Sequence, residues 1–151
     1  MGYFLLALVS FLAYLASEGH WYDYRRKVRS GELRDRGDLF YTQASRFTPS
    51  APISLLEIYR QLPEEECRRW GISCQLKEQE LIFQLHPLLG YHRMDFKIEA
   101  RMIQSPLSGC LLYYISHWQE RHPELALEQC NRLLTMLEEA LLLLDSRLEI
   151  H

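Results

Sequence analysis

The first 17 residues, MGYFLLALVSFLAYLAS, carry no charged side chain and are apolar on every side of a helix. A helix without a polar stripe is normally buried in protein or surrounded by lipid. A membrane-spanning helix needs roughly 20 residues, with a lower limit near 17. The run extends to Tyr24 if Glu18, His20 and Asp23 lie near the interface, where headgroups and water are present. We therefore expect residues 1–24 to form a membrane-anchor helix.

The residues that follow the apolar run have the composition of a membrane interface. Aromatic side chains come first and basic side chains next, which is the order typical of the end of a transmembrane helix. The predicted interface residues are Trp21, Tyr22, Tyr24, Arg25, Arg26, Lys27 and Arg29. Because these cations follow the span, the positive-inside rule predicts a single-pass protein whose C-terminal body lies in the cytoplasm. The same cations can attract anionic lipid.

Two alternatives to a membrane anchor are a cleaved secretory signal and a buried helix. Cleavage is disfavoured because no Lys or Arg precedes the apolar run. Neither Ala16 nor Ser17 has a small residue two positions before it, where Tyr14 and Leu15 lie, so neither ends a typical cleavage site. A helix that packs under the domain or against a partner would be unusual with so continuous an apolar run.

Composition and cysteine pattern limit the classes of protein. A hydrophobic content of 48% with 25% charged residues is typical of a folded protein. A formal charge of −3 argues against nucleic-acid binding, which needs a concentrated basic face. No two of Cys67, Cys74, Cys110 and Cys130 form a C-x-x-C pair. In a reducing cytoplasm we expect four free thiols, whereas disulfides would indicate an exported domain.

The rest of the chain divides into a segment over 25–50 and a soluble domain over 51–151. The first contains Gly31, Gly37 and mixed charges without periodicity, which predicts a basic juxtamembrane segment and linker. The domain begins with a predicted helix over 52–61, capped by Ser50 or Ala51. A second short helix is predicted over 63–71, with acids first, bases last and glycine after its end.

Apolar residues recur with a period of two from residue 72 to residue 103. Strands are predicted around 72–76, 81–85 and 94–102, and the last has a charged outer face. The three should form an antiparallel meander. Its first turn, at Glu78 and Gln79, lacks favourable turn residues.

Two helices are predicted to complete the domain, over 107–122 and from Pro123 onward. The second has a heptad-like apolar stripe, formed by Leu127, Cys130, Leu134, Leu137, Leu141, Leu144 and Leu148. As a core element, this helix would pack across the sheet with the helix before it. As an interface, Leu137, Leu141, Leu144 and Leu148 would contact a protein partner or a second copy.

The best candidate for catalytic chemistry is the group Tyr113, His117 and Glu120. In a helix His117 and Glu120 are one turn apart, so a carboxylate would orient an imidazole as a general base requires. His86, His92 and Cys74 could approach one another around a turn, but their spacing is not that of a metal site. Because no nucleotide-binding, metalloprotease or nucleophile motif is present, neither a cofactor nor a metal is predicted.

These observations predict an α+β protein: an N-terminal transmembrane helix, then a small domain whose three-stranded antiparallel sheet is covered by two C-terminal helices. The expected function is that of a membrane-anchored, non-enzymatic interaction or assembly protein, such as an accessory subunit or adaptor. Its expected partners are the lipid bilayer and a protein partner or second copy. The alternative is a membrane-tethered enzyme or ligand-binding domain that uses the Tyr113, His117 and Glu120 region.

Overall fold

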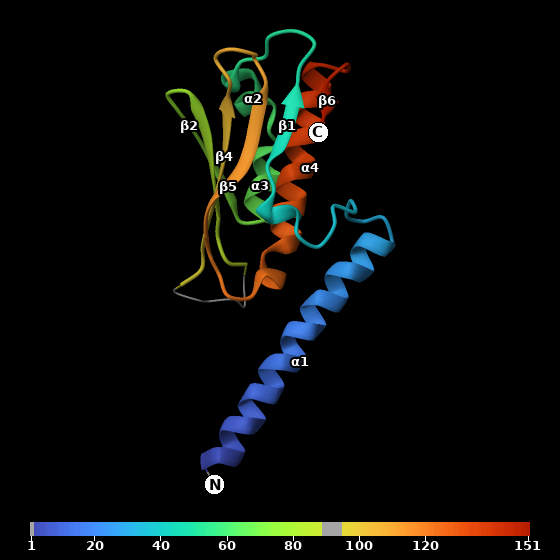
Figure 1. Cartoon of the computed structure of the whole chain (residues 1–151), viewed down its shortest axis with the longest axis vertical. Helices are drawn as coiled ribbons and strands as arrows, with labels where there is room; N and C mark the ends of the chain where they lie inside the picture. Colours follow the sequence, from blue (N-terminus) through green and yellow to red (C-terminus); the bar gives the residue numbers. More distant parts are fainter. Residues whose placement is uncertain (1, 89–94) are drawn as a thin grey trace.

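Helix α1 (Gly2–Arg29) extends beyond one end of an α+β domain and packs on it near the helix C-terminus (Figure 1). This arrangement is that of a computed structural model, which describes residues 2–88 and 95–151. The large apolar side chains from Tyr3 to Leu15 are exposed, Tyr3 at 91% and Phe4 at 74%. Helix α1 is long and apolar enough to cross a membrane.

The domain contains a six-stranded antiparallel sheet. Its strands are β1 (Ser45–Thr48), β2 (Ile72–Lys77), β3 (Glu80–Leu85), β4 (Lys97–Gln104), β5 (Leu111–Gln119) and β6 (Glu149–Ile150). They lie in the order β2-β3-β4-β5-β1-β6. The predicted meander is therefore present as β2, β3 and β4, but the predicted number of three strands is wrong. Strand β1 also lies within the segment predicted as a linker, and residue 94, the predicted start of the third strand, is outside the described residues.

The helix predicted over 107–122 is wrong, because Leu111–Gln119 forms β5. A β-bulge explains the error. Ile98 of β4 pairs with Trp118, while Ala100 pairs with Ile115, so β5 has one more residue than β4 between these pairs. The core-facing residues of β5 therefore have spacings of two, two and then three. Apolar residues three positions apart are also typical of amphipathic helices. The sequence of β5 therefore does not show the uninterrupted period of two that predicts a strand.

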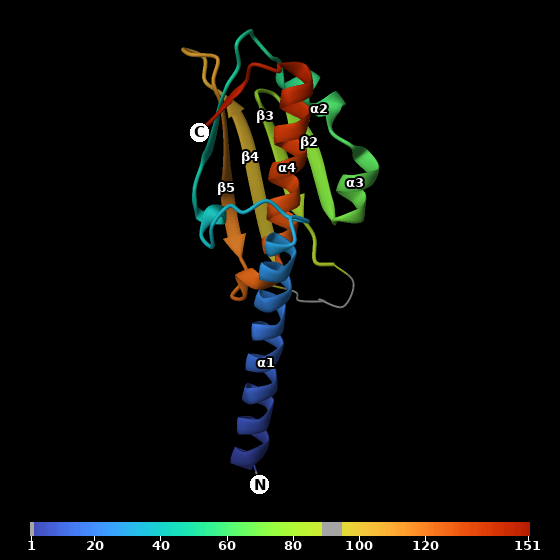
Figure 2. The ribbon, with the colours of Figure 1, turned by 90° about the vertical axis from the view of Figure 1, so that its right-hand side faces the viewer.

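Short helices α2 (Leu55–Gln61) and α3 (Glu64–Arg69) lie beside β2 (Figure 2). Helix α2 is capped by Ser54 rather than by Ser50 or Ala51. The Ser54 hydroxyl accepts from the Glu57 N–H at 3.2 Å, and the Glu57 carboxylate accepts from the Ser54 N–H at 2.8 Å. Helix α3 has the predicted order of acids, bases and glycine, and Gly71 adopts a φ of +65° just after its end.

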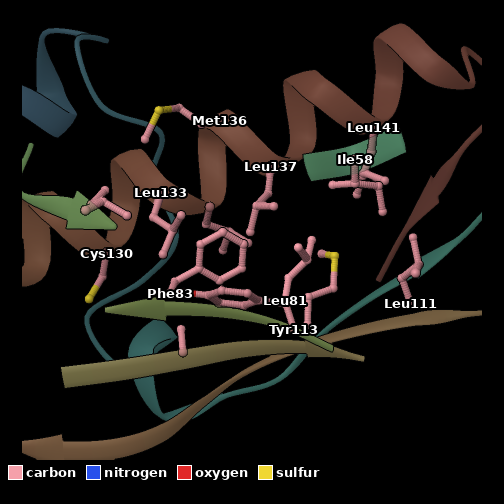
Figure 3. Packing of buried hydrophobic residues seen from close by; sticks show 14 of the residues in the cluster. Ile58, Leu81, Phe83, Leu111, Tyr113, Cys130, Leu133, Met136, Leu137 and Leu141 are labelled. Carbon is pink, nitrogen blue, oxygen red and sulfur yellow. The ribbon is translucent and has the colours of Figure 1, made fainter. Parts of the chain in front are cut away.

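Helix α4 (Leu127–Leu144) covers one face of the sheet, after the 3₁₀ turn η2 (Pro123–Leu125). Leu133, Leu137 and Leu141 are fully buried and point toward the sheet, where Leu81 and Phe83 lie opposite (Figure 3). The sheet's covering layer thus contains one long C-terminal helix in place of the predicted two. The opposite face carries polar side chains, among them Glu80, Glu99 and Arg101 on β3 and β4.

Candidate functional site

The C-terminal end of α1 packs on α4 through a second, smaller apolar cluster. Tyr24, Leu33 and Leu127 are its buried members, and Trp21 and Val28 pack against them. Phe40 and Tyr41, in the 3₁₀ turn η1 (Phe40–Thr42), complete the contact. Residues 21–41 are therefore fixed to the domain. This contact, with the polar groups of residues 24–36 and 128–138 described next, is called the α1–α4 junction.

Asn131 lies at the centre of the α1–α4 junction and is fully buried. Its side-chain Nδ2 donates to the Tyr24 hydroxyl at 3.2 Å and to the Arg34 carbonyl at 2.8 Å. Its Oδ1 accepts from the Arg36 guanidinium at 3.3 Å. A buried amide must have such partners to be tolerated. The amide therefore favours one position of α1 relative to α4.

Glu138 places a carboxylate in the same junction with only 4% of its surface exposed. Arg36 donates to both carboxylate oxygens, at 2.6 and 3.1 Å, and also to the Thr135 hydroxyl at 2.8 Å. The Arg34 guanidinium donates to the same carboxylate. A buried charge needs paired, hydrogen-bonded partners, and the two arginines supply them.

Ion pairs continue toward α1 at the outer side of the α1–α4 junction. Lys27 Nζ lies 2.8 Å from Glu128 and 3.3 Å from Asp23. Arg132 pairs with Glu128 and Glu32, both at 2.9 Å. Helix α1 thus has an ion-paired cation facing α4 just beyond its apolar stretch.

The structure separates the seven predicted membrane-interface residues into two groups. Tyr24 is buried, and Trp21 and Lys27 are half-buried against the domain. The exposed members are Tyr22, Arg25, Arg26 and Arg29. For the exposed group a membrane-interface role stays a prediction, whereas Trp21, Tyr24 and Lys27 take part in the α1–α4 junction. The guanidinium of Arg25 also stacks over the Trp21 ring at 5.2 Å.

The leucines predicted to form a partner interface differ in their exposure. Leu137 and Leu141 are fully buried in the core, and Leu148 is 8% exposed in the turn before β6. Leu144 is 36% exposed and Leu143 is 74% exposed. Leu137 and Leu141 are therefore core residues that a partner cannot contact while the domain is folded.

Tyr113, His117 and Glu120 do not converge on a site. Tyr113 lies in the core, where burial raises the pKa of its hydroxyl well above the ordinary value. His117 is exposed on the opposite face of the sheet. Glu120 is 7% exposed beyond the end of β5, where its carboxylate accepts from the His122 N–H at 3.0 Å. The general-base arrangement expected from a helix is absent because these residues follow a strand and a bulge.

A shallow polar recess lies around His117, lined also by Lys97, Glu99, Arg101 and Tyr114. The Glu99 carboxylate accepts from Arg101 and from Ser116, both at 2.9 Å. Although burial opposes the change, these hydrogen bonds lower the pKa of Glu99. The carboxylate is therefore ionised at neutral pH and is poorly suited to act as a proton donor.

Neither the histidines nor the cysteines form a metal site in the part of the chain that the structure describes. No group of three potential ligands was found there. Cys74 points to the α4 side of the sheet, whereas the exposed His86 ring contacts the Ser73 hydroxyl at 3.1 Å. His92 lies outside the described residues. The four cysteines are unpaired, and Cys67, Cys110 and Cys130 are buried.

We predict that Cys110 is the thiol that titrates near neutral pH. Hydrogen bonds from Ser108, Arg46 and Thr48 lower the pKa of Cys110 to about 7, whereas burial raises the pKa of Cys130 to about 12. Cys110 is 8% exposed, and we expect its reactive thiolate to form as pH rises through about 7. Site-resolved iodoacetamide alkylation, followed by mass spectrometry from pH 5 to 9, should reach half its plateau rate near pH 7 at Cys110. Arg46→Gln should move this midpoint upward, and a wild-type rate still rising steeply above pH 8.5 would contradict the prediction.

Comparisons with protein-family models, curated proteins and solved structures found no match to this chain.

The α1–α4 junction was not identified from the sequence. The sequence feature that could have indicated this junction is a polar stripe on α4, the helix that also has the leucine stripe. Glu128, Asn131, Thr135 and Glu138 recur at intervals of three and four, so they share one face of α4. Such a stripe usually faces solvent. Here it faces Arg34 and Arg36, whose positions in an irregular segment carry no periodic signal.

Proposed function

We propose that this chain is a membrane-anchored, non-enzymatic interaction or assembly protein whose domain lies on the cytoplasmic side of the bilayer. The observation that supports this most directly is the exposed apolar surface of α1. None of its most apolar 18-residue window is buried against the domain. So large an apolar surface requires lipid or another protein to cover it.

The dimensions of α1 agree with this proposal. At about 1.5 Å per residue, its 28 residues extend about 42 Å, whereas the hydrocarbon core of a bilayer is about 30 Å thick. The excess length allows the last turns to lie outside the bilayer, where they meet α4. The exposed Arg25, Arg26 and Arg29 then lie next to the span, which favours a cytoplasmic domain.

The α1–α4 junction supports an interaction role. A protein that only tethers an enzyme to the membrane can use a flexible linker, and such linkers are rich in glycine and serine. In this chain the anchor is instead attached through buried hydrogen bonds and ion pairs, including those of Asn131 and Glu138. A fixed orientation is useful where one surface of the domain must face a partner.

We expect the chain to remain with membranes after an alkaline carbonate wash. The Leu8→Lys, Leu12→Lys variant should appear in the supernatant, because at neutral pH, where the helix inserts, a charged lysine at the bilayer centre costs about 3 kcal/mol. Both leucines are exposed, so the domain should still fold. Leu107→Lys is the matched control, since Leu107 is 97% exposed in the β4–β5 loop, and this loop lies at the end of the domain opposite α1 (Figure 1).

Purification of the full chain from detergent-solubilised membranes tests the assembly role. The mass and composition of the particle should show a second protein at fixed stoichiometry. Release of the wild-type chain by carbonate would refute the anchor, and a particle with one copy of this chain alone would refute the assembly role.

The orientation is tested with a maleimide label at Leu107→Cys in a Cys110→Ser background. Labelling should require opened cells. Labelling in intact cells would reverse the proposed topology.

A further inference from the structure

Strand β2 forms a free edge of the sheet. In the part of the chain that the structure describes, β2 pairs with β3 on one side and with no strand on the other. The opposite edge is the two-residue strand β6. An edge strand presents unpaired N–H and C=O groups, which can pair with another chain. Strand β2 is six residues long, so it offers more of these groups to a pairing strand than β6 does.

The register of β2 shows which backbone groups face this edge. The His86 N–H donates to the Gly71 carbonyl at 2.7 Å, and this contact continues the register in which Ile72 pairs with Leu85. In an antiparallel ladder, hydrogen-bonded pairs alternate with non-bonded pairs. The backbone groups of Ile72, Cys74 and Leu76 therefore point away from β3.

A groove of about 470 Å³ lies between β2 and helices α2 and α3. Figure 2 shows α3 beside β2 at this edge of the sheet. Apolar side chains line the groove, among them Leu62, Cys67, Ile72 and Cys74. Burial raises the pKa of Cys74 to about 12, so its thiol is neutral at physiological pH. The exposed Tyr59 adds an aromatic ring to the rim.

The rim of the groove is positively charged overall. Arg60 and Arg68 line it with one carboxylate, that of Glu64. Arg68 pairs with Glu64 at 3.1 Å. Arg60 forms no ion pair with any described residue, so its guanidinium is available to an acidic group.

We propose that this groove binds an extended peptide segment of a partner protein, which adds a strand to β2. The segment forms backbone hydrogen bonds with Ile72, Cys74 and Leu76, packs an apolar side chain on the groove floor and places an acidic side chain beside Arg60. In this mode of recognition, backbone hydrogen bonds to the sheet edge give affinity, and pockets for alternate side chains give specificity. The inference rests on the proposed function and names the site at which the partner is held.

A second copy of the chain does not fit this groove in a membrane. A two-fold dimer that pairs β2 with β2 requires antiparallel strands. The strands and α1 run along the same long axis of the molecule, and α1 leaves from one end of it (Figures 1 and 2). Antiparallel pairing would place the two α1 helices at opposite ends. Two copies anchored in one bilayer therefore cannot pair in this way.

The test uses the full chain in lipid nanodiscs and a phage library of random twelve-residue peptides, depleted first on empty nanodiscs. Selected peptides should alternate apolar and polar residues and carry Asp or Glu. Cys74→Pro, which removes an edge N–H, and Arg60→Glu should each weaken the best peptide at least tenfold. Arg60 is exposed, so its substitution leaves the fold intact. Tyr114→Ala, on the far face of the sheet, is the control and should bind as wild type does.

Hydrogen exchange supplies a second readout. The bound peptide should slow exchange at the amides of Ile72, Cys74 and Leu76. Three results would overturn the proposal. The first is no enrichment of peptides over empty nanodiscs, and the second is equal binding of the best peptide to wild type and to Arg60→Glu. The third is self-association of the chain that Cys74→Pro abolishes. If the natural complex from membranes survives both substitutions, the groove proposal fails while the assembly role stands.

Discussion

Replacing Leu137 with alanine is expected to lower the free energy of unfolding of the domain by about 3 kcal/mol. Leu137 is fully buried between α4 and the sheet, next to Phe83 and Leu133 (Figure 3). Truncation of such a leucine removes apolar contacts and leaves a cavity, which together cost about 2–5 kcal/mol. Urea unfolding of the purified chain in detergent, followed by tryptophan fluorescence, measures the change.

Leu144→Ala is the matched control for Leu137→Ala. Leu144 is on the same helix and in the same leucine stripe, but 36% of its surface is exposed. We expect this change to cost less than about 1 kcal/mol, since much of the removed surface already contacts solvent. If Leu137→Ala left stability unchanged and altered only the composition of the assembly, Leu137 would be an interface residue and not a core residue.

Replacing Glu138 with alanine is expected to release α1 from the domain. Arg36 is only 11% exposed and both of its contacts with Glu138 would be lost, which leaves a buried guanidinium without its counter-ion. Removal of one partner of a buried ion pair costs about 3–5 kcal/mol. Because the remaining core does not depend on this pair, we expect local opening of residues 30–36 before the domain unfolds.

Two spin labels can measure this release. Labels at the exposed positions Tyr22 of α1 and Glu139 of α4 should show one narrow distance distribution in the parent protein. Glu138→Ala should broaden this distribution. Thr135→Ala is a matched control on the same face of α4, because it removes only the one hydrogen bond that the Thr135 hydroxyl accepts from Arg36 and leaves Glu138 in place as the counter-ion. A narrow distribution in Glu138→Ala would show that the apolar cluster alone fixes α1.

Sequence patterns predicted the elements whose periodicity is regular. Helix α1 is recognisable from its uninterrupted apolar run, and β2, β3 and β4 from their period of two. Helix α3 is recognisable from the order of its charges. Helix α4 is recognisable from its leucines, whose spacing follows from the 3.6 residues of each helical turn. In the three strands and in α3 and α4, local geometry decides which residues face the core.

The errors have physical causes that act over longer distances. Strand β5 was missed because the bulge opposite Glu99 and Ala100 changes its phase. Strands β1 and β6 are too short for a pattern, since β1 buries only Phe47 and β6 buries no residue. The junction was missed because Asn131 and Glu138 meet Arg34 and Arg36 across about 100 positions of sequence. Burial of a polar side chain depends on such a distant partner.

The attachment of α1 to α4 determines the position and orientation of the groove beside β2 relative to the membrane. With α1 in a bilayer, the groove would stay at a constant distance from the lipid surface. Its orientation relative to that surface would also stay constant as the protein diffuses. Partners that are themselves membrane-bound would then be encountered by lateral diffusion within a thin layer. The rigid attachment would act as an increase in effective concentration, which lets a weak peptide contact produce a stable complex.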